Sequence, residues 1–366
     1  GGITWTDFDN DGDVDLLVAG VSSQLYRNDG AGVFTPVTGG QLVERGGQAG
    51  GANWGDYDND GFLDLYLPRT DSAQPLPSFL FHNNGDGTFT QVEQSPFTDD
   101  IGFSVNASWG DYDNDGWLDL FATEHQNGMN RLYHNSGDGT FTRIISAPIA
   151  DDVANCTPGI WGDYDRDGFL DLFVATFIRN SASPPNDYLY HNDGNGNAWI
   201  TIKCVGTRSN RSAIGAKLRV KATIKGKTFW QLREITTGDG WGGIPLEAHF
   251  GLGNATNAEM LRIEWPSGTV QEFQNVAAKQ YLTITEPAQP PAICSVFSPI
   301  GVFNNGFGFE VRGSPGQVAV VEGSTNLLQW FPLQTYRFTS SPQGFLDPTW
   351  RESTSRFYRL RPDFSK

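Results

Sequence analysis

The sequence is poor in sulfur and in long apolar runs. Its 366 residues include two methionines and three cysteines, Cys156, Cys204 and Cys294. Three widely separated cysteines indicate neither a disulfide framework nor a cysteine-based zinc site, so we expect isolated buried thiols. The apolar runs are all shorter than the roughly 18 residues that a membrane-spanning helix requires. The sequence therefore predicts no membrane span.

Positive charge is also scarce. The chain carries 25 Lys and Arg against 42 Asp and Glu, a net charge of −17, which argues against nucleic acid as a partner of the whole protein. The sequence contains no G-x-S-x-G, H-E-x-x-H, Walker-type or dinucleotide-binding motif, which are readable signatures of several enzyme classes. A non-enzymatic function is favoured over a catalytic one, and no catalytic residue is predicted.

What the chain has in abundance is one acidic nonapeptide, D-x-D-x-D-G-x-x-D. Its four copies, the aspartate loops, span 7–15, 56–64, 111–119 and 163–171. Ca²⁺ takes six to eight oxygen ligands, and a tight loop turned by glycine can direct alternate side chains at one ion. Clustered aspartates repel one another unless a cation neutralises them. The pattern therefore predicts about four Ca²⁺ ions per chain rather than acidic turns that serve only solubility.

Positions 1, 3, 5 and 9 of each loop are predicted to supply carboxylates. Position 7 is predicted to supply its backbone carbonyl, because its side chain varies from acid to aromatic. The predicted metal ligands are Asp7, Asp9, Asp11, Asp13, Asp15, Asp56, Asp58, Asp60, Phe62, Asp64, Asp111, Asp113, Asp115, Trp117, Asp119, Asp163, Asp165, Asp167, Phe169 and Asp171. An EF-hand is excluded, because position 12, where that loop requires Glu, holds Val18, Leu67, Ala122 and Val174.

The loops recur about every 50 residues, a period typical of propeller blades. A second motif recurs in phase with them, at 25–34, 80–89, 132–141 and 189–197. Its Asn-Gly and Asp-Gly runs are hairpin turns, so each unit is predicted to form one four-stranded blade. Residues repeated once per unit are interpreted as blade packing (Trp5, Trp54, Trp109, Trp161, His82, His134 and His191).

Residues 1–197 resemble the FG-GAP/VCBS repeat family, on the strength of the D-x-D-x-D-G-x-x-D-L signature. The resemblance implies a calcium-binding β-propeller like the integrin α-subunit head, with about seven blades where this chain has four. An arc of four blades leaves two open sheet edges. We expect that about three N-terminal blades lie outside this chain. A compact four-bladed ring, or an oligomer that pairs through open blade edges, is the alternative.

After Asn197 the calcium pattern stops, and residues 198–286 are predicted to form a second all-β domain. The segments 206–217, 249–253 and 265–268 resemble the ASPIC/UnbV domain, which follows FG-GAP repeats in the cartilage acidic protein family and its bacterial relatives. The segment 238–243 departs from that family, whose members more often carry Ser, Tyr or Gln there.

Positive charge is concentrated in this second domain, where 203–233 holds five Lys and four Arg without an acidic residue. One hypothesis is a patch for an anionic ligand such as an acidic or sulfated glycan. The alternatives are a solvated strand face or a surface that docks on the acidic propeller. The candidate ligand residues are Lys217, Arg219, Lys221, Arg208, Arg211 and the unrepeated His125.

Residues 287–292 form a proline-rich linker. Residues 293–366, rich in aromatic and turn residues, are predicted to form a small C-terminal β-sandwich, and they resemble a short module of large secreted bacterial proteins.

Together these features predict a secreted, extracellular or cell-surface protein whose native signal peptide is not in this chain, because low-affinity calcium modules suit extracellular calcium. The predicted function is non-enzymatic binding of a glycan or an extracellular protein. A polysaccharide lyase-like enzyme with a pocket on the propeller or at the domain junction is one alternative, and a structural assembly scaffold is another.

Overall fold

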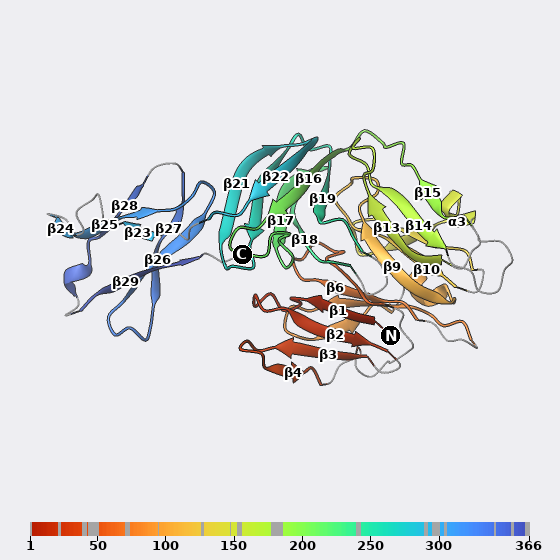
Figure 1. The fold of residues 1–366 in the computed structure, drawn as a ribbon, viewed down its shortest axis with the longest axis horizontal. Coiled ribbons are helices and arrows are strands. Elements are labelled where there is room, and N and C mark those ends of the chain that lie inside the picture. The colour runs from red at the N-terminus through yellow and green to blue at the C-terminus, as the bar shows by residue number, and fades with distance from the viewer. Residues whose placement is uncertain are drawn as a thin grey trace.

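The computed structural model describes residues 2–20, 23–38, 42, 51–69, 74–93, 95–125, 128–146, 148–151, 156–176, 186–238, 243–288, 292–294, 301–303, 306–339, 342–352 and 355–362. Nearly every regular element in these residues is a β-strand, which confirms the all-β prediction. The strands form three successive units, namely a row of blades, a second β-domain and a C-terminal module (Figure 1). Among the described residues, no helix is long and apolar enough to cross a membrane.

The first unit consists of four antiparallel sheets in which the strands pair in chain order, as in propeller blades. The first two sheets comprise β1 (Gly2–Thr6), β2 (Asp15–Ala19), β3 (Gln24–Asn28), β4 (Phe34–Pro36), and then β5 (Asn53–Gly55), β6 (Asp64–Leu67), β7 (Phe79–Asn83), β8 (Phe89–Gln91). The next two comprise β9 (Ser104–Gly110), β10 (Asp119–Glu124), β11 (Arg131–Asn135), β12 (Phe141–Ile144), and then β13 (Cys156–Gly162), β14 (Asp171–Thr176), β15 (Tyr188–Tyr190). One-turn helices α2 (Pro96–Asp99) and α3 (Pro148–Asp151) precede β9 and β13.

Successive blades are held together by a contact that repeats. The indole of Trp109 stacks on Tyr57 of the preceding blade (ring centroids 6.3 Å apart, 12° between planes). It also lies over Gly55, where a Cβ would come within 2.8 Å of the ring. The amide of Asn135 donates to the Tyr57 carbonyl (2.8 Å). Equivalent contacts join the other neighbouring blades: Trp54 and Asn83 to Phe8, and Trp161 and Asn192 to Tyr112. The interpretation of the tryptophans as packing residues agrees with this geometry.

The second unit contains two sheets that enclose one hydrophobic core. One sheet has the order β19 (Glu247–Gly253), β16 (Ala198–Val205), β22 (Gln280–Thr285), and β16 and β22 are parallel. The other has the order β18 (Lys227–Glu234), β17 (Lys217–Ile224), β20 (Asn257–Glu264), β21 (Val270–Ala277). The apolar residues that alternate along β17, such as Leu218 and Val220, are fully buried in the core.

The C-terminal module is a second pair of sheets, at the left in Figure 1. One sheet contains β23 (Ala292–Cys294), β24 (Gly301–Phe303), β25 (Gly306–Arg312) and β28 (Gln343–Asp347), and the other has the order β27 (Phe331–Arg337), β26 (Val318–Ser324), β29 (Phe357–Pro362). A short 3₁₀ turn spans Trp350–Glu352. Of the cysteines, Cys156 and Cys204 are buried and not disulfide-bonded, and the side chain of Cys294 lies outside the described residues.

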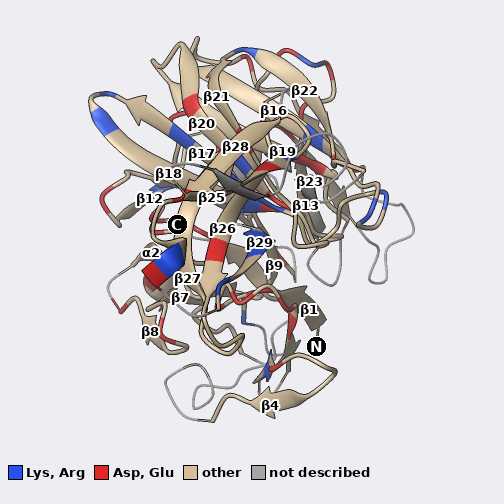
Figure 2. Cartoon of the chain, turned by 90° about the vertical axis from the view of Figure 1, so that its left-hand side faces the viewer, with Lys and Arg blue, Asp and Glu red and all other residues tan. Residues whose placement is uncertain are grey.

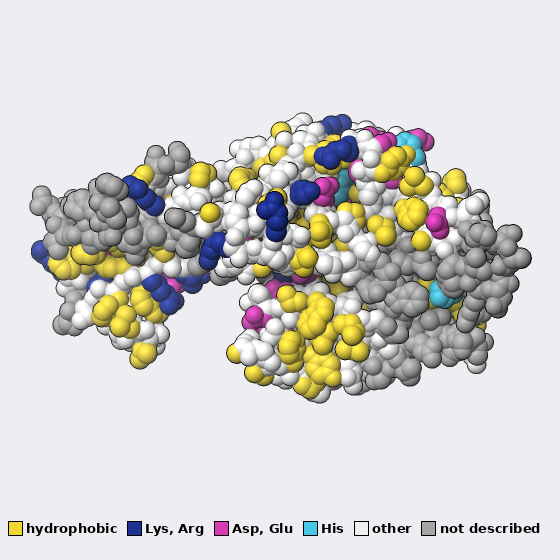
Figure 3. All heavy atoms as spheres, viewed as in Figure 1, with side chains coloured by type: hydrophobic (Ala, Val, Ile, Leu, Met, Phe, Trp, Pro, Cys, Tyr) yellow, Lys and Arg dark blue, Asp and Glu magenta, His cyan; other side chains and the backbone are white. Residues whose placement is uncertain are grey.

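Exposed apolar side chains gather on the first blade and on the C-terminal module (Figure 3). On the first blade they are Ile3, Trp5, Val33 and Phe34, and on the module they include Leu327, Leu328, Phe331 and Leu333. On the first blade, Ile3 and Trp5 adjoin the second unit, since they line cavities together with its residues.

The repeated asparagine contact yields a prediction of stability. Asn135 is fully buried, and its amide donates to the carbonyls of Tyr57 and Leu118. The substitution Asn135→Ala leaves buried carbonyls without donors, which costs about 1–3 kcal/mol each. We expect Asn135→Ala to lower the free energy of unfolding by at least about 2 kcal/mol in urea denaturation. Asn84→Ala, at an exposed asparagine of another hairpin, serves as the control and is expected to change it little. Equal effects of the two substitutions would contradict the proposed contact.

Candidate functional site

Each aspartate loop is closed by its first aspartate. In the second loop the Asp56 carboxylate accepts hydrogen bonds from the backbone N–H groups of Asp60 (3.0 Å) and Gly61 (3.2 Å). Asn59 (φ 58°) and Gly61 (φ 94°) lie in the left-handed region, which Asn and Gly adopt more readily than other residues. Asp7, Asp111 and Asp163 close the other loops in the same way. The glycine of the motif is therefore required by the turn itself.

The ninth residue of each loop ties the loop to the hairpin of its own blade. Asp64 is fully buried, and its carboxylate accepts from the backbone N–H groups of Tyr57 (3.1 Å) and Asn83 (2.8 Å). Asp15, Asp119 and Asp171 make the corresponding pairs of bonds. One carboxylate thus fixes the loop, the second strand and the third strand relative to one another.

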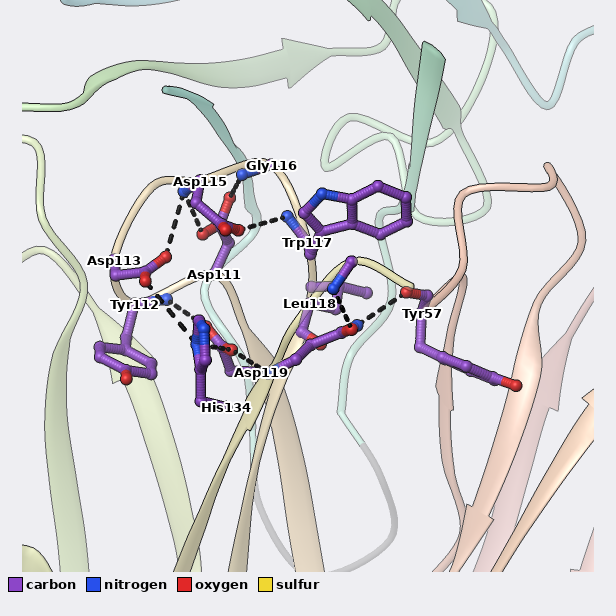
Figure 4. A network of polar contacts seen from close by, with 12 residues as sticks. Tyr57, Asp111, Tyr112, Asp113, Asp115, Gly116, Trp117, Leu118, Asp119 and His134 are labelled. Atoms are coloured by element: carbon purple, nitrogen blue, oxygen red, sulfur yellow. Dashed lines mark hydrogen bonds and ion pairs between the residues drawn. The ribbon is translucent and has the colours of Figure 1, made fainter. Parts of the chain in front are cut away.

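Several carboxylates of each loop converge on one small volume. Ligand atoms of Asp56, Asp58 and Asp60 all lie within 4.8 Å of one another. In the first loop the same holds for Asp7, Asp9 and Asp15. The third loop is drawn in Figure 4, where Asp111, Asp113 and Asp115 line the inside of the turn and Asp119 rises from the strand below. The predicted carboxylate positions are therefore brought together.

A histidine of the hairpin faces these carboxylates in three of the four blades. His82 Nδ1 lies 3.0 Å from an Asp58 oxygen and 3.2 Å from an Asp64 oxygen. His134 and His191 lie in the same way against the third and fourth loops. The sequence analysis interpreted these histidines as blade packing and missed their contacts with the loop carboxylates. Their recurrence in phase with the loops was the feature that indicated such contacts. In the first blade Arg27 pairs instead with Asp29 (2.6 Å).

The seventh residue of each loop directs its side chain away from the carboxylates. The rings of Phe62, Trp117 and Phe169 lie over a hairpin glycine of their own blade, where a Cβ would come within 2.6 Å of the ring. The glycines are Gly85, Gly137 and Gly194. This packing explains why the seventh position accepts aromatic residues, and it leaves the backbone carbonyl as that residue's available oxygen.

The protein environment opposes the charge on these carboxylates. Burial raises the pKa of Asp15, Asp64 and Asp119 to about 7. Burial, with repulsion from neighbouring loop aspartates, raises the pKa of Asp56 and Asp111 well above its usual range. Hydrogen bonds to Asp64 and Asp119 raise the pKa of His82 and His134 to about 9. A divalent cation within each loop would remove this repulsion, so the donor set fits a hard, oxygen-preferring ion.

The second domain sits on the aspartate loops. Lys217 on β17 contacts the first loop through its Nζ, which lies 2.7 Å from an Asp7 oxygen and donates to the Asp7 carbonyl (2.9 Å) and to Asn10 Oδ1 (2.6 Å). Arg219, two residues on, donates to the Gly61 carbonyl of the second loop (3.2 Å) and to Asn10 Oδ1 (3.1 Å). One strand of the second domain therefore bridges two loops.

The third and fourth loops are contacted by other strands of the same domain. His249 Nε2 lies 2.6 Å from Asn114 Oδ1, and the Gly253 N–H donates to the Asn114 carbonyl (2.8 Å). At the fourth loop the Tyr281 hydroxyl donates to Asp163, and the Arg166 guanidinium lies over the Tyr281 ring, 4.0 Å from its centroid. All four loops thus contribute to the interface between the two units.

The six residues of the predicted ligand patch are not brought together. Lys217 and Arg219 are buried in this interface, so strand β17 docks on the propeller, one of the alternatives considered for its charge. Lys221 keeps 37% of its side chain exposed, and Arg211 and Arg208 are exposed. Figure 2 shows the Lys and Arg segments around β17 and β18.

His125 is separate from these residues. It follows β10, at the opposite end of that strand from the aspartate loop, and it is half-buried. The basic strand β17 contacts the loop ends of the blades, so His125 does not join the basic residues.

The geometry described above defines a class of protein: a row of propeller blades with aspartate loops, covered by a second β-domain. An FG-GAP-like repeat model matches residues 7–67, 72–122 and 111–174, and an ASPIC and UnbV model matches 206–291. The chain belongs to the family in which FG-GAP repeats are followed by an ASPIC/UnbV domain. The resemblance identified from the sequence motifs is confirmed.

Curated relatives agree with this family. The chain is 26% identical to human cartilage acidic protein 1 over 276 residues, which is 58% of this chain and 40% of the relative. It is 26% identical over 299 residues to cartilage acidic protein 1 of Xenopus tropicalis, which is 64% of this chain and 45% of the relative. The chain thus spans less than half the length of the curated relatives it matches.

The docking of β17 yields a second prediction. Arg219→Met removes the bonds to Gly61 and Asn10 but keeps the length of the aliphatic stem. Because buried acceptors then lose their donors, we expect the free energy of unfolding to fall by about 1–3 kcal/mol. Lys221→Met on the same strand is the matched control, since Lys221 is partly exposed and its nearest carboxylate oxygen lies 4.0 Å away. Denaturant titration of both variants tests the difference, and a larger loss in Lys221→Met would contradict the interface.

The raised pKa values yield a third prediction for the metal-free protein. Since the pKa of Asp15, Asp64 and Asp119 is about 7 in the folded state, the folded state binds more protons than the unfolded state between about pH 4 and 7. Its stability therefore falls as pH rises through that range. His82 and His134 act in the same direction, because the stability they contribute is complete below about pH 6.5 and is lost as pH rises through about 9.

We expect the melting temperature in EGTA to fall from pH 5 to pH 9. Added Ca²⁺ should reverse the trend between pH 5 and 7, because the ion competes with protons for the same oxygens. A melting temperature in EGTA that rises over this range would contradict the assignment of the buried carboxylates.

Proposed function

We propose that the four aspartate loops bind Ca²⁺, about one ion each, and that the chain is a calcium-organised, non-enzymatic binding module. The observation that carries the proposal is the convergence of carboxylates within 4.8 Å of one another in a turn closed by glycine. Bound Ca²⁺ would supply charge neutralisation and a common centre for oxygen ligands. The acidic clusters and the FG-GAP family model both support this proposal.

The residues proposed to hold each ion are the carboxylates at positions 1, 3, 5 and 9 and the carbonyl at position 7. The hairpin histidine lies beside positions 3 and 9, where its N–H can orient the two carboxylates in the way that outer-shell partners orient metal ligands. Calcium would then stabilise the folded state directly, since an unfolded chain does not assemble the site.

Calcium in these loops would also act on the second domain. The loop backbone and the asparagine at position 4 form much of the interface with β17 and β19. A loop held in one conformation presents these groups at fixed positions, so the proposed role of calcium is to lock the first two units together.

A location outside the cell or at its surface fits this proposal. FG-GAP repeats and relatives named cartilage acidic protein 1 support an extracellular or surface protein, and loops of this kind suit millimolar calcium. Within this setting the module is proposed to bind a glycan or another extracellular protein. The lyase-like and scaffold functions remain predictions from the sequence. No specific set of described residues supports either of them.

The test is calorimetric titration of Ca²⁺ into the EGTA-treated, dialysed protein, combined with thermal melting. We expect about four sites per chain and a melting temperature that increases with calcium concentration, because the ion binds the folded state alone. Asp58→Asn removes one carboxylate of the second loop and is expected to abolish one site.

Asp86→Asn is the matched control for this test, because Asp86 lies in the hairpin of the same blade and its carboxylate bonds to Thr88 rather than to a loop. It is expected to keep all the sites. A protein that binds no calcium and does not change its melting temperature would sink the proposal.

A further inference from the structure

A cavity of about 180 Å³ lies at the junction of the first two units. Its floor is formed by the innermost strands of the four blades, each of which contributes one tryptophan. Its roof is formed by β18, β19 and the residues Ile244 and Pro245 of the second domain. The tryptophans are Trp5, Trp54, Trp109 and Trp161. The cavity therefore lies where the repeated blades converge, and residues of the second domain that occur once cover it.

The tryptophans offer apolar surface rather than hydrogen bonds. The indole N–H groups of Trp54, Trp109 and Trp161 donate to the preceding blade, at 3.0–3.2 Å. Trp5, in the first blade, is 52% exposed. Aromatic rings whose polar atoms are satisfied elsewhere favour a ligand with at least one apolar face.

Arg233 on β18 supplies an unsatisfied donor beside this apolar floor. Its Nη1 donates to the carbonyl of the adjacent Leu232 (2.8 Å), and its Nη2 is buried without a hydrogen-bond partner in the described part of the chain. A buried N–H group without an acceptor costs about 1–3 kcal/mol. An oxygen of a ligand in the cavity would satisfy it.

Carboxylates share the cavity with this guanidinium. Glu234 and Glu247 of the second domain line it, together with Asp111 and Asp163, which are proposed calcium ligands. An anionic ligand would meet the like charges of Glu234 and Glu247, and a purely apolar ligand would leave Arg233 unsatisfied. A hydroxyl group satisfies both sides, since it can accept from the guanidinium and donate to a carboxylate.

His249 is held by contacts of both its ring nitrogens. Although His249 lines the cavity, its Nε2 contacts Asn114 Oδ1 (2.6 Å) and its Nδ1 contacts Thr201 Oγ1 (2.9 Å). Both ring nitrogens are engaged within the interface, so the imidazole is not available to transfer a proton to a ligand.

We propose that this cavity binds one neutral hexose unit of a glycan, with an apolar sugar face against the tryptophans and a hydroxyl oxygen accepting from Arg233 Nη2. The proposal rests on the proposed function as a glycan-binding module and places its ligand against the inner strands of the blades instead of on the exposed basic residues. A six-membered ring with its hydroxyl groups has the combination of shape, donors and acceptors that the lining provides.

The test is a titration of the calcium-loaded full chain with methyl α-D-glucoside, methyl α-D-galactoside and methyl α-D-mannoside, followed by tryptophan fluorescence and calorimetry. We expect at least one hexoside to bind with 1:1 stoichiometry and a Kd of about 1 mM, the scale for a ligand of this size. D-glucuronate and choline, as anionic and cationic probes, are expected to bind at least tenfold more weakly.

Two variants locate the site. Arg233→Gln and Trp5→Ala are each expected to weaken hexoside binding at least tenfold, and Trp5→Ala is the safer variant for folding because that side chain is half exposed. Arg211→Gln, at an exposed arginine of the same domain, is the control and is expected to bind as the parent does. Melting curves verify that each variant is folded.

The outcomes separate this inference from the calcium proposal. Saturable hexoside binding that is lost in Trp5→Ala and kept in Arg211→Gln supports the cavity. Binding lost in Arg211→Gln but kept in Trp5→Ala overturns it and moves the site to the exposed basic residues. A calcium-stabilised protein that binds none of the three hexosides, or that prefers glucuronate or choline, also overturns it while leaving the calcium sites intact.

Discussion

The arrangement of this protein depends on carboxylates that are forced close together inside four tight turns. Asp64 illustrates the constraint, because one fully buried carboxylate joins the loop at Tyr57 to the hairpin at Asn83. Burying and crowding such groups is costly unless protons, histidines or a cation compensate their charge. Each blade therefore contains a cluster of mutually repelling carboxylates. The groups that compensate this charge also hold the strands of the blade in register.

The same turns also connect the blades to one another and to the second domain. The asparagine at position 4, held at positive φ by the turn, uses its amide nitrogen on the glycine carbonyl of the next loop, as Asn10 does with Gly61 (3.1 Å). Its amide oxygen is left for the second domain, where Lys217 and Arg219 donate to it. One asparagine side chain thus connects its loop both to the next blade and to the covering domain.

The sequence revealed the features that repeat and missed most of those that do not. The loops, their period and the hairpins follow from local spacing, because turn chemistry and strand alternation act within one blade. Strand β17 shows the limit. Its alternation correctly places Leu218 and Val220 in a core and puts Lys217 and Arg219 on the other face, for which the sequence left open a ligand, solvent or the propeller. That face is buried against loops about 160–210 residues away in the chain, and no local pattern selects such a partner among the alternatives. Arg233 and the cavity beneath it were missed for the same reason.

The fourth blade shows how the repeat is brought to an end. In the first three loops an asparagine reaches the next loop, and the last of these bonds runs from Asn114 to the Gly168 carbonyl (2.9 Å). The fourth loop has Arg166 at that position, and this side chain turns to the Tyr281 ring of the second domain.

A second substitution of the same kind occurs on the inner strands. Gly55 and Gly110 each lie under the tryptophan of the following blade, whereas Gly162 faces Pro245 of the second domain. At the fourth loop and at the last inner strand, a residue of the second domain therefore occupies the position that a following blade would contact. Arrays of repeats need a terminal unit that covers the last exposed interface, and here the domain that covers the loops also caps the row. The cavity lies between these two sets of contacts, with the inner strands of the blades on one side and the covering domain on the other.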